Sequence, residues 1–201
     1  MPDRITVALT RRRFGGAVLL LAGIVLAAIV LWPSGGGGGQ TATRPAPRTT
    51  RLPVRIVSVP ALGLAFAHPT TWTRTVEGQV FSLRSPDRSI QVIVSSPLAR
   101  PAQLEAKDSA KTALLAQFSP AKVVRDGPEK LGGRQAASFE LAGRDDGKPV
   151  RALVLVASTD YRTYVVTLLT GEHPSRDRLR QARQILATMQ FGKPGSSGDR
   201  G

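Results

Sequence analysis

Residues 136–169 read AASFELAGRDDGKPVRALVLVASTDYRTYVVTLL. Three consecutive strands are predicted here: 136–141 alternates apolar and polar residues, 150–157 is apolar on both faces, and 161–169 is largely apolar. The sequence Asp-Asp-Gly at 145–147 is a hairpin-turn signal, because Asp and Gly tolerate a positive φ. Strands joined by such short turns pair antiparallel, and we expect 150–157 to be a central strand of the sheet.

Further strands and two helices complete the predicted domain. Strands are expected at 79–84, 89–94 and 121–124, a helix at 101–118, and a second helix that Pro174 opens. Apolar side chains recur at helical spacing in the first helix and are expected to face the sheet: Leu104, Leu114, Leu115 and Phe118. The order of elements is strands, a helix, four strands and a final helix. This order predicts an α+β fold, with an antiparallel sheet and two packed helices.

A long apolar segment precedes this domain. Residues 14–32 read FGGAVLLLAGIVLAAIVLW, 19 residues without a charge. A helix of that length spans about 28 Å, close to the ~30 Å hydrocarbon core of a bilayer, so we expect a single transmembrane helix. A cleaved signal peptide with a secreted domain is the alternative. Retention is favoured, because signal peptides have shorter apolar cores and a small-residue cleavage site, which is missing here.

The remaining segments divide the chain around this helix. Residues 1–13 form a basic N-terminus that ends in three consecutive arginines, so the positive-inside rule predicts a cytoplasmic N-terminus and a domain outside the cell membrane. Arginines in the linker weaken this asymmetry. The Gly, Pro, Arg and Thr composition of 33–56 predicts a disordered linker, 57–192 is the predicted globular domain, and 193–201 is expected to be a disordered tail.

Charge and composition restrict the possible partners. The net charge is +14, but residues 1–55 carry eight arginines and one aspartate, which account for half of it. The domain has few aromatic residues for stacking, so nucleic-acid binding is not expected. The final helix carries four arginines, interpreted as a solvated face, with anionic lipid or an acidic partner as the alternative: Arg176, Arg178, Arg180 and Arg183. The absence of cysteine excludes disulfides, thiolate metal sites and a thiol nucleophile.

Motifs for catalysis or for metal binding do not emerge from the sequence. His68 and His173 are 105 residues apart and lack ligands at metal-site spacing, so His68 is expected at a strand end or in a loop and His173 at a helix start. The glycine-rich segment formed by Gly132 and Gly133 is too short for a phosphate loop, and no G-x-S-x-G nucleophile elbow is present. We therefore assign no catalytic, cofactor-binding or metal-binding residue, and we leave the binding residues unknown.

Several packing features together resemble a known family. They are Leu64 to Pro69 followed by Trp72, the strand at 89–94, the helix after Pro101, the glycine pair that approaches a strand, Tyr164, and a final helix that closes on Phe191. The pattern resembles, over about residues 61–191, the PsbP-like family of α/β/α sandwiches. This family includes the photosystem II extrinsic subunit, Ran-binding nuclear import factors, and bacterial DcrB-like and LpqN-like exported proteins.

The resemblance implies an accessory or adaptor domain that binds proteins, or in some bacterial members lipids, and not an enzyme. We therefore expect a membrane-tethered, extracytoplasmic binding module with two partners: the bilayer, through residues 14–32, and an unknown protein or lipid. A lipid or small-ligand carrier with a cavity between sheet and helix is the alternative. A hydrolase is kept only as a remote third possibility, because catalytic partners can be far apart in sequence.

Overall fold

The computed structural model describes residues 53–97 and 100–195. The predicted basic N-terminus 1–13, the membrane helix 14–32, most of the linker and the end of the tail lie outside the described residues, so their assignments stay predictions. Among the described helices, none has both the length and the apolar character needed to cross a membrane.

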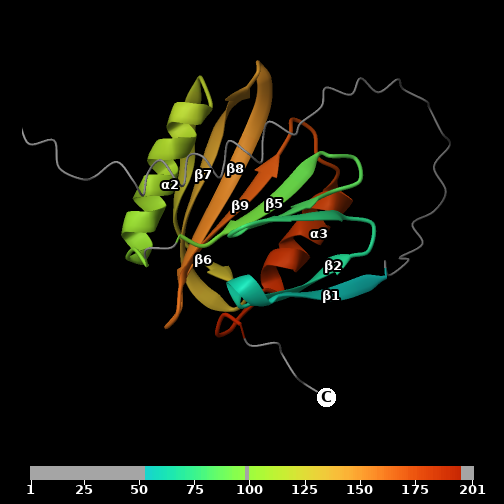
Figure 1. The fold of residues 1–201 in the computed structure, drawn as a ribbon. Coiled ribbons are helices and arrows are strands. Elements are labelled where there is room, and N and C mark those ends of the chain that lie inside the picture. The colour runs from blue at the N-terminus through green and yellow to red at the C-terminus, as the bar shows by residue number, and fades with distance from the viewer. Residues whose placement is uncertain (1–52, 98–99, 196–201) are drawn as a thin grey trace, which may run out of the picture.

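A seven-stranded antiparallel sheet forms the centre of the domain, as predicted (Figure 1). Its spatial order is β3 (Thr73–Glu77), β4 (Val80–Arg84), β5 (Ile90–Ser95), β9 (Thr163–Thr170), β8 (Lys148–Ser158), β7 (Arg134–Asp145) and β6 (Ala121–Leu131). The stretch predicted to be a central strand lies in β8, between β9 and β7. The turn at 145–147 joins β7 to β8, and Asp146 and Gly147 both have the expected positive φ.

Strand β3 was not predicted, and β6 was predicted too short. All five residues of β3 are exposed, so no apolar pattern marks it. At the other edge of the sheet, β6 continues well beyond the predicted 121–124 and contains a register shift after Val123 and a proline, Pro128. An edge strand tolerates proline and a bulge, because one side of its backbone is not paired within the sheet.

A second, three-stranded sheet contains the start and the end of the domain. It has the order β1 (Val54–Val59), β2 (Leu64–Pro69) and β10 (Gln190–Phe191), and a 3-10 helix η1 (Pro60–Leu62) links β1 to β2. Residues 54–56 therefore belong to a strand, and not to the disordered linker as predicted. The start of the predicted disordered tail is also fixed, because the Gly195 N–H donates to the Pro60 carbonyl at 2.8 Å.

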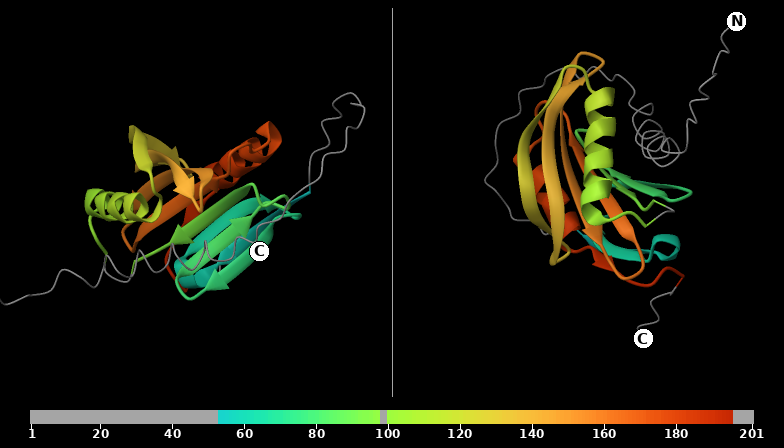
Figure 2. Two further views of the ribbon diagram at one scale, coloured as in Figure 1. Left: turned by 90° about the horizontal axis from the view of Figure 1, so that it is seen from above. Right: turned by 90° about the vertical axis from the view of Figure 1, so that its left-hand side faces the viewer.

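The two helices cover opposite faces of the large sheet (Figure 2). Helix α2 (Gln103–Gln117) packs on one face, and α3 (Arg176–Ala187) lies on the other face together with the small sheet. The buried stripe of α2 differs from the prediction: it contains Ala106, Ala110 and Leu114, continues to Phe118, and leaves Leu104 and Leu115 exposed. The two alanines have short side chains, which lets the helix lie close to the sheet.

Tyr164 connects the two sheets from the centre of the core. Its side chain is fully buried, and its hydroxyl donates to the Leu62 carbonyl at 2.6 Å. Its ring packs against Phe191, with 4.7 Å between ring centroids. Burial raises the pKa of this phenol. The expectation that Tyr164 is a core residue is therefore confirmed, and so is that for Trp72, which is also buried.

The β6–β7 turn offers a test of how tightly α3 is packed. Gly132 and Gly133 both have positive φ, and the Gly132 N–H donates to the Leu186 carbonyl at 3.1 Å. A Cβ on Gly132 would overlap the Met189 carbonyl, whereas one on Gly133 would meet nothing within 4 Å.

Gly132→Ala is therefore expected to destabilise the domain more than Gly133→Ala. Both variants put alanine in the left-handed region, which costs about 1–2 kcal/mol. Only Gly132→Ala must also displace backbone at the end of α3, so its loss of unfolding free energy should exceed about 3 kcal/mol. Urea unfolding, followed by tryptophan fluorescence, measures both losses. Equal losses in the two variants would contradict the close approach of this turn to α3.

Candidate functional site

The two histidines lie in different environments. His68 lies at the penultimate position of β2, near a strand end as expected, but it is only 4% exposed, which the sequence did not reveal. Its Nδ1 lies 2.8 Å from the Pro69 carbonyl oxygen, and its Nε2 has no hydrogen-bond partner within residues 53–97 and 100–195. The His173 side chain is exposed and lies just before α3. In the described part of the chain, no group of three or more ligating side chains could hold a metal ion.

The surroundings of His68 favour its neutral form. Burial lowers the pKa of the imidazole, the hydrogen bond to Pro69 opposes this, and the charges of Arg74 and Arg55 lower the pKa further. Nδ1 carries the proton that Pro69 accepts, so a second proton would go to Nε2, where it would find no acceptor. The residue is thus a buried, neutral part of the core.

The position of His68 predicts a specific loss of stability in acid. Its pKa is lowered in the folded state, so the unfolded chain binds more protons below the ordinary value of about 6.5. The free energy of unfolding should fall as the pH drops below about 6.5, with a slope of at most about 1.4 kcal/mol per pH unit. His68→Phe should reduce that slope, whereas His173→Phe should not. Urea unfolding at a series of pH values measures this slope. An unchanged slope in His68→Phe would contradict the assignment of His68 as a buried, neutral residue.

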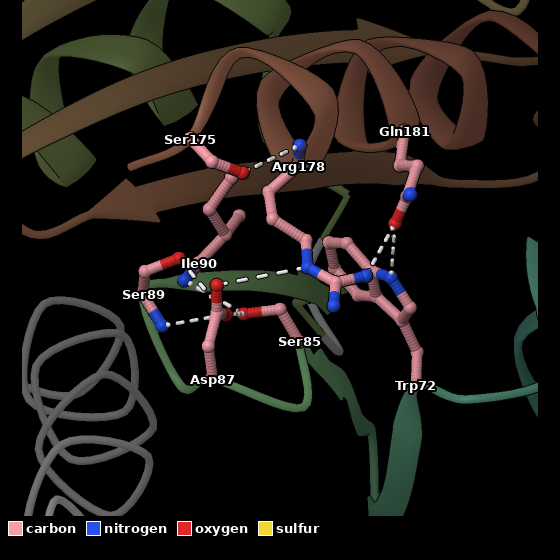
Figure 3. A network of polar contacts seen from close by, with 8 residues as sticks. All are labelled: Trp72, Ser85, Asp87, Ser89, Ile90, Ser175, Arg178 and Gln181. Carbon is pink, nitrogen blue, oxygen red and sulfur yellow. Dashed lines mark hydrogen bonds and ion pairs between the residues drawn. The ribbon is translucent and has the colours of Figure 1, made fainter. Parts of the chain in front are cut away.

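A polar network joins α3 to the β4–β5 turn (Figure 3). Asp87 accepts hydrogen bonds from the Ser85 hydroxyl at 2.6 Å and from both the backbone N–H and the hydroxyl of Ser89. Arg178 of α3 lies 3.6 Å from the other carboxylate oxygen. Burial raises the pKa of Asp87, but the serine hydrogen bonds and the Arg178 charge outweigh it, so the pKa lies below its usual value.

The same network continues to Trp72. Gln181 accepts from Trp72 Nε1 at 2.9 Å and from Arg178 at 3.0 Å, so its amide oxygen lies between the ring and the guanidinium (Figure 3). Of the basic face predicted for α3, Arg178 is turned to the sheet and pairs with Asp87, whereas Arg180 pairs with Asp177 in an exposed contact on the helix itself. We interpret the network as a structural link between helix and sheet, because its donors and acceptors satisfy one another.

A hollow with three cationic side chains lies at one end of the large sheet. Its volume is about 370 Å³, and three segments that are distant in sequence supply its basic residues: the connection before α2, the β8–β9 turn and the chain after β10. We call it the cationic hollow. It is lined by Gln79, Pro97, Arg100, Tyr161, Arg162, Lys193 and Pro194.

The β8–β9 turn contributes Tyr161 and Arg162 to the cationic hollow, and hydrogen bonds fix its conformation. The Thr159 hydroxyl donates to the Arg162 carbonyl at 3.0 Å and accepts from the backbone N–H groups of Tyr161 and Arg162. The Thr159 N–H also donates to the Arg162 carbonyl, at 2.8 Å. A hydroxyl that bonds its own turn in this way stabilises a tight connection. Tyr161 therefore belongs to the turn and not to the strand as predicted, and it is 52% exposed.

The two arginines are held by neutral groups. Arg100 donates to the carbonyls of Thr159 and Asp160, both at 2.5 Å, and Arg162 donates to the Gln79 side chain at 3.0 Å. Neither guanidinium forms an ion pair with a carboxylate in the described residues. The sequence indicates no role for Arg100 or Arg162, because only the fold brings them together and neither belongs to a motif.

A second hollow of about 400 Å³ lies where the start of α2 meets β6 and β7. It is lined by Leu104, which is 64% exposed, by Lys107, and by Pro128 and Ala137 among others. The carrier alternative requires an internal cavity between sheet and helix. The cationic hollow is lined by no helix residue and does not correspond to that cavity. The second hollow does lie between α2 and the sheet, but it opens beside the exposed Leu104, and none of the large buried side chains of the core lines it.

Comparison with known proteins connects this fold to solved structures. No family model matches the sequence, and no curated protein matches it significantly. A crystal structure from Bacteroides thetaiotaomicron is similar with a TM-score of 0.51 and 13% identity; the match covers 70% of this chain but only about half, 49%, of that one.

Two further similar structures belong to groups that the sequence resembles. LpqN of Mycobacterium tuberculosis, a protein involved in cell envelope biogenesis, has a TM-score of 0.48 and 14% identity over 71% of this chain and 92% of its own. The cyanobacterial PsbP of Synechocystis has a TM-score of 0.46 and 14% identity over 81% of this chain and 99% of its own. Identity this low concerns the fold alone, and at that level the resemblance to PsbP-like proteins predicted from the sequence is confirmed.

Proposed function

We propose that this chain is a membrane-tethered, extracytoplasmic, non-enzymatic binding module that holds an acidic segment of a partner protein in the cationic hollow. The observation that carries the proposal is the convergence of Arg100 and Arg162, both without a carboxylate partner among the described residues, beside the half-exposed Tyr161.

The geometry of Arg100 prepares it for a carboxylate. A guanidinium has five N–H donors in a rigid plane, and the carbonyls of Thr159 and Asp160 engage only part of them. These bonds leave the positive charge uncompensated and restrict the side chain before a partner arrives. Restricting a binding group in advance reduces the entropy lost on association. A partner carboxylate then forms charge-assisted hydrogen bonds, worth about 1.5–3 kcal/mol each.

The composition of the hollow favours a protein partner over a lipid surface. Tyrosine and arginine are the side chains that contribute most often to the energetic centre of protein interfaces. Recognition of anionic lipid relies on clusters of about four to eight basic residues. The cationic hollow contains three, from Arg100, Arg162 and Lys193, and it includes an aromatic side chain at its rim.

A binding measurement with defined peptides tests the hollow. The full chain in detergent micelles is titrated into a fluorescein-labelled hexaglutamate peptide, with hexaglutamine as the neutral comparison, and anisotropy reports binding. Arg162→Gln and Tyr161→Ala should each weaken hexaglutamate binding about tenfold, equivalent to about 1.4 kcal/mol. Arg134→Gln, which removes an exposed arginine of β7 outside the hollow, is the matched control and should leave binding unchanged.

Three outcomes decide the proposal. Weakening in the two hollow variants alone supports it. An equal loss of hexaglutamate affinity in Arg134→Gln means that binding depends only on the net charge of the protein, which contradicts the proposal. Stronger binding to phosphatidylglycerol vesicles than to hexaglutamate, lost in Arg162→Gln, would replace the protein partner by a lipid surface.

The membrane tether has its own support and its own test. It rests on the 19 uncharged residues 14–32. In cells, the chain should remain in the membrane pellet after alkaline carbonate washing and keep its full mass of 21.4 kDa, and protease added outside should remove the domain. A secreted product shortened at its N-terminus would show instead that the segment is a cleaved signal peptide.

A further inference from the structure

The edge of the small sheet is a second surface of interest. In the order β1-β2-β10, β1 pairs with β2 on one side only, and within the described residues no strand pairs with its other side. Its six residues pair with β2 in an unbroken register, without a bulge. Edge strands are commonly protected by proline, by charged side chains (above all lysine) or by a bulge, and β6 contains all three. Strand β1 has no proline, lysine or bulge between Val54 and Val59, and Arg55 is its single charged residue.

The two faces of β1 have different chemistry. Val54 and Ile56 lie on the outer face and are 52% and 79% exposed. Arg55 lies on the opposite face, directly across from His68 of β2. Arg55 forms no ion pair with any described residue, and its charge, like that of Arg74, acts on His68. The edge therefore combines unpaired backbone, an exposed apolar side chain and uncompensated positive charge.

We infer that the free edge of β1 binds an extended segment of a partner protein as an added strand, with a carboxylate side chain facing Arg55 and an apolar side chain facing Ile56. In this mode of recognition, main-chain hydrogen bonds supply affinity and alternate side chains supply specificity. The surface uses no residue of the cationic hollow, so it stands independently of the function proposed above.

Charge complementarity selects this occupant over two others. A second copy of β1 would bring another arginine and no acidic residue, because the strand reads VRIVSV. The chain's own residues 1–52 contain seven arginines and a single aspartate, so they are repelled by Arg55 and Arg74. A foreign strand that places a carboxylate beside Arg55 and an apolar side chain beside Ile56 satisfies the charge, the apolar face and the backbone together.

Peptide binding combined with hydrogen exchange tests the inference. The full chain in detergent micelles is mixed with the labelled peptide Thr-Val-Glu-Val-Glu-Val-Thr, or with its lysine counterpart, in which both glutamates are replaced. The glutamate peptide should bind at least about tenfold more tightly than the lysine peptide. Its binding should slow amide exchange within residues 54–59 and leave the amides of the far edge strand β6 unchanged.

Variants separate this edge from the hollow. Arg55→Gln and Ile56→Thr should each weaken the glutamate peptide severalfold, while Arg134→Gln, again the matched control, should not. Both test positions are exposed, so the fold should tolerate the changes. The measurement is repeated in Arg162→Gln, and the protection of 54–59 should persist there even if binding in the hollow is lost.

Several results would overturn the inference. Equal affinity for the two peptides removes the charge argument, and peptide binding without protection of 54–59 removes the added strand. Protection of 54–59 that rises with protein concentration in the absence of peptide would mean that a second copy occupies the edge.

Discussion

Burial of β9 on both faces is the constraint on which the rest of the domain depends. All eight of its residues are buried. Val165 and Leu169 pack in the cluster under α2, whereas Tyr164, Val166 and Leu168 pack in the cluster under α3 and the small sheet. A strand buried on both faces needs a cover on each, because apolar side chains left on either face would be exposed to water. The two helices and the small sheet supply those covers, and the hydroxyl of Tyr164 ties the small sheet to the core.

The same strand determines where the cationic hollow forms. The turn from Thr159 to Arg162 enters β9 directly, and its hydrogen bonds hold it against the buried strand end. The Thr163 hydroxyl donates to the Pro101 carbonyl at 2.8 Å, which brings the segment before α2 next to the turn. Arg100 then reaches the carbonyls of Thr159 and Asp160. A site built on loops therefore acquires its geometry from a rigid strand beneath it.

The sequence predicted those elements whose buried residues form a recognisable pattern, either an alternation of apolar and polar residues or a continuous apolar run. Strand β7 was predicted because apolar and polar residues alternate in it, β8 and most of β9 because they are continuous apolar runs, and the turn at 145–147 because it reads Asp-Asp-Gly. Strand β3 has no buried face, and β1 begins within a Pro- and Arg-rich segment typical of linkers, so neither was predicted. The predicted stripe of α2 was confirmed at Leu114 and Phe118 and wrong at Leu104 and Leu115, because the sheet accepts the smaller side chains of Ala106 and Ala110 in their place.

The residues of the cationic hollow form no recognisable pattern in the sequence, for a physical reason. An exposed arginine without an ion pair costs almost nothing in water, so a lone basic residue in the sequence carries no information about binding. Arg178 shows the opposite case: it belonged to a run of arginines on one helix, yet the fold engages it with Asp87 and Gln181. What distinguishes Arg100 is not its charge but its confinement, since two backbone carbonyls fix the guanidinium and no carboxylate in the described part of the chain pairs with it. Neutral acceptors position a cation without neutralising it, and that combination suits a group that must meet an anion from outside.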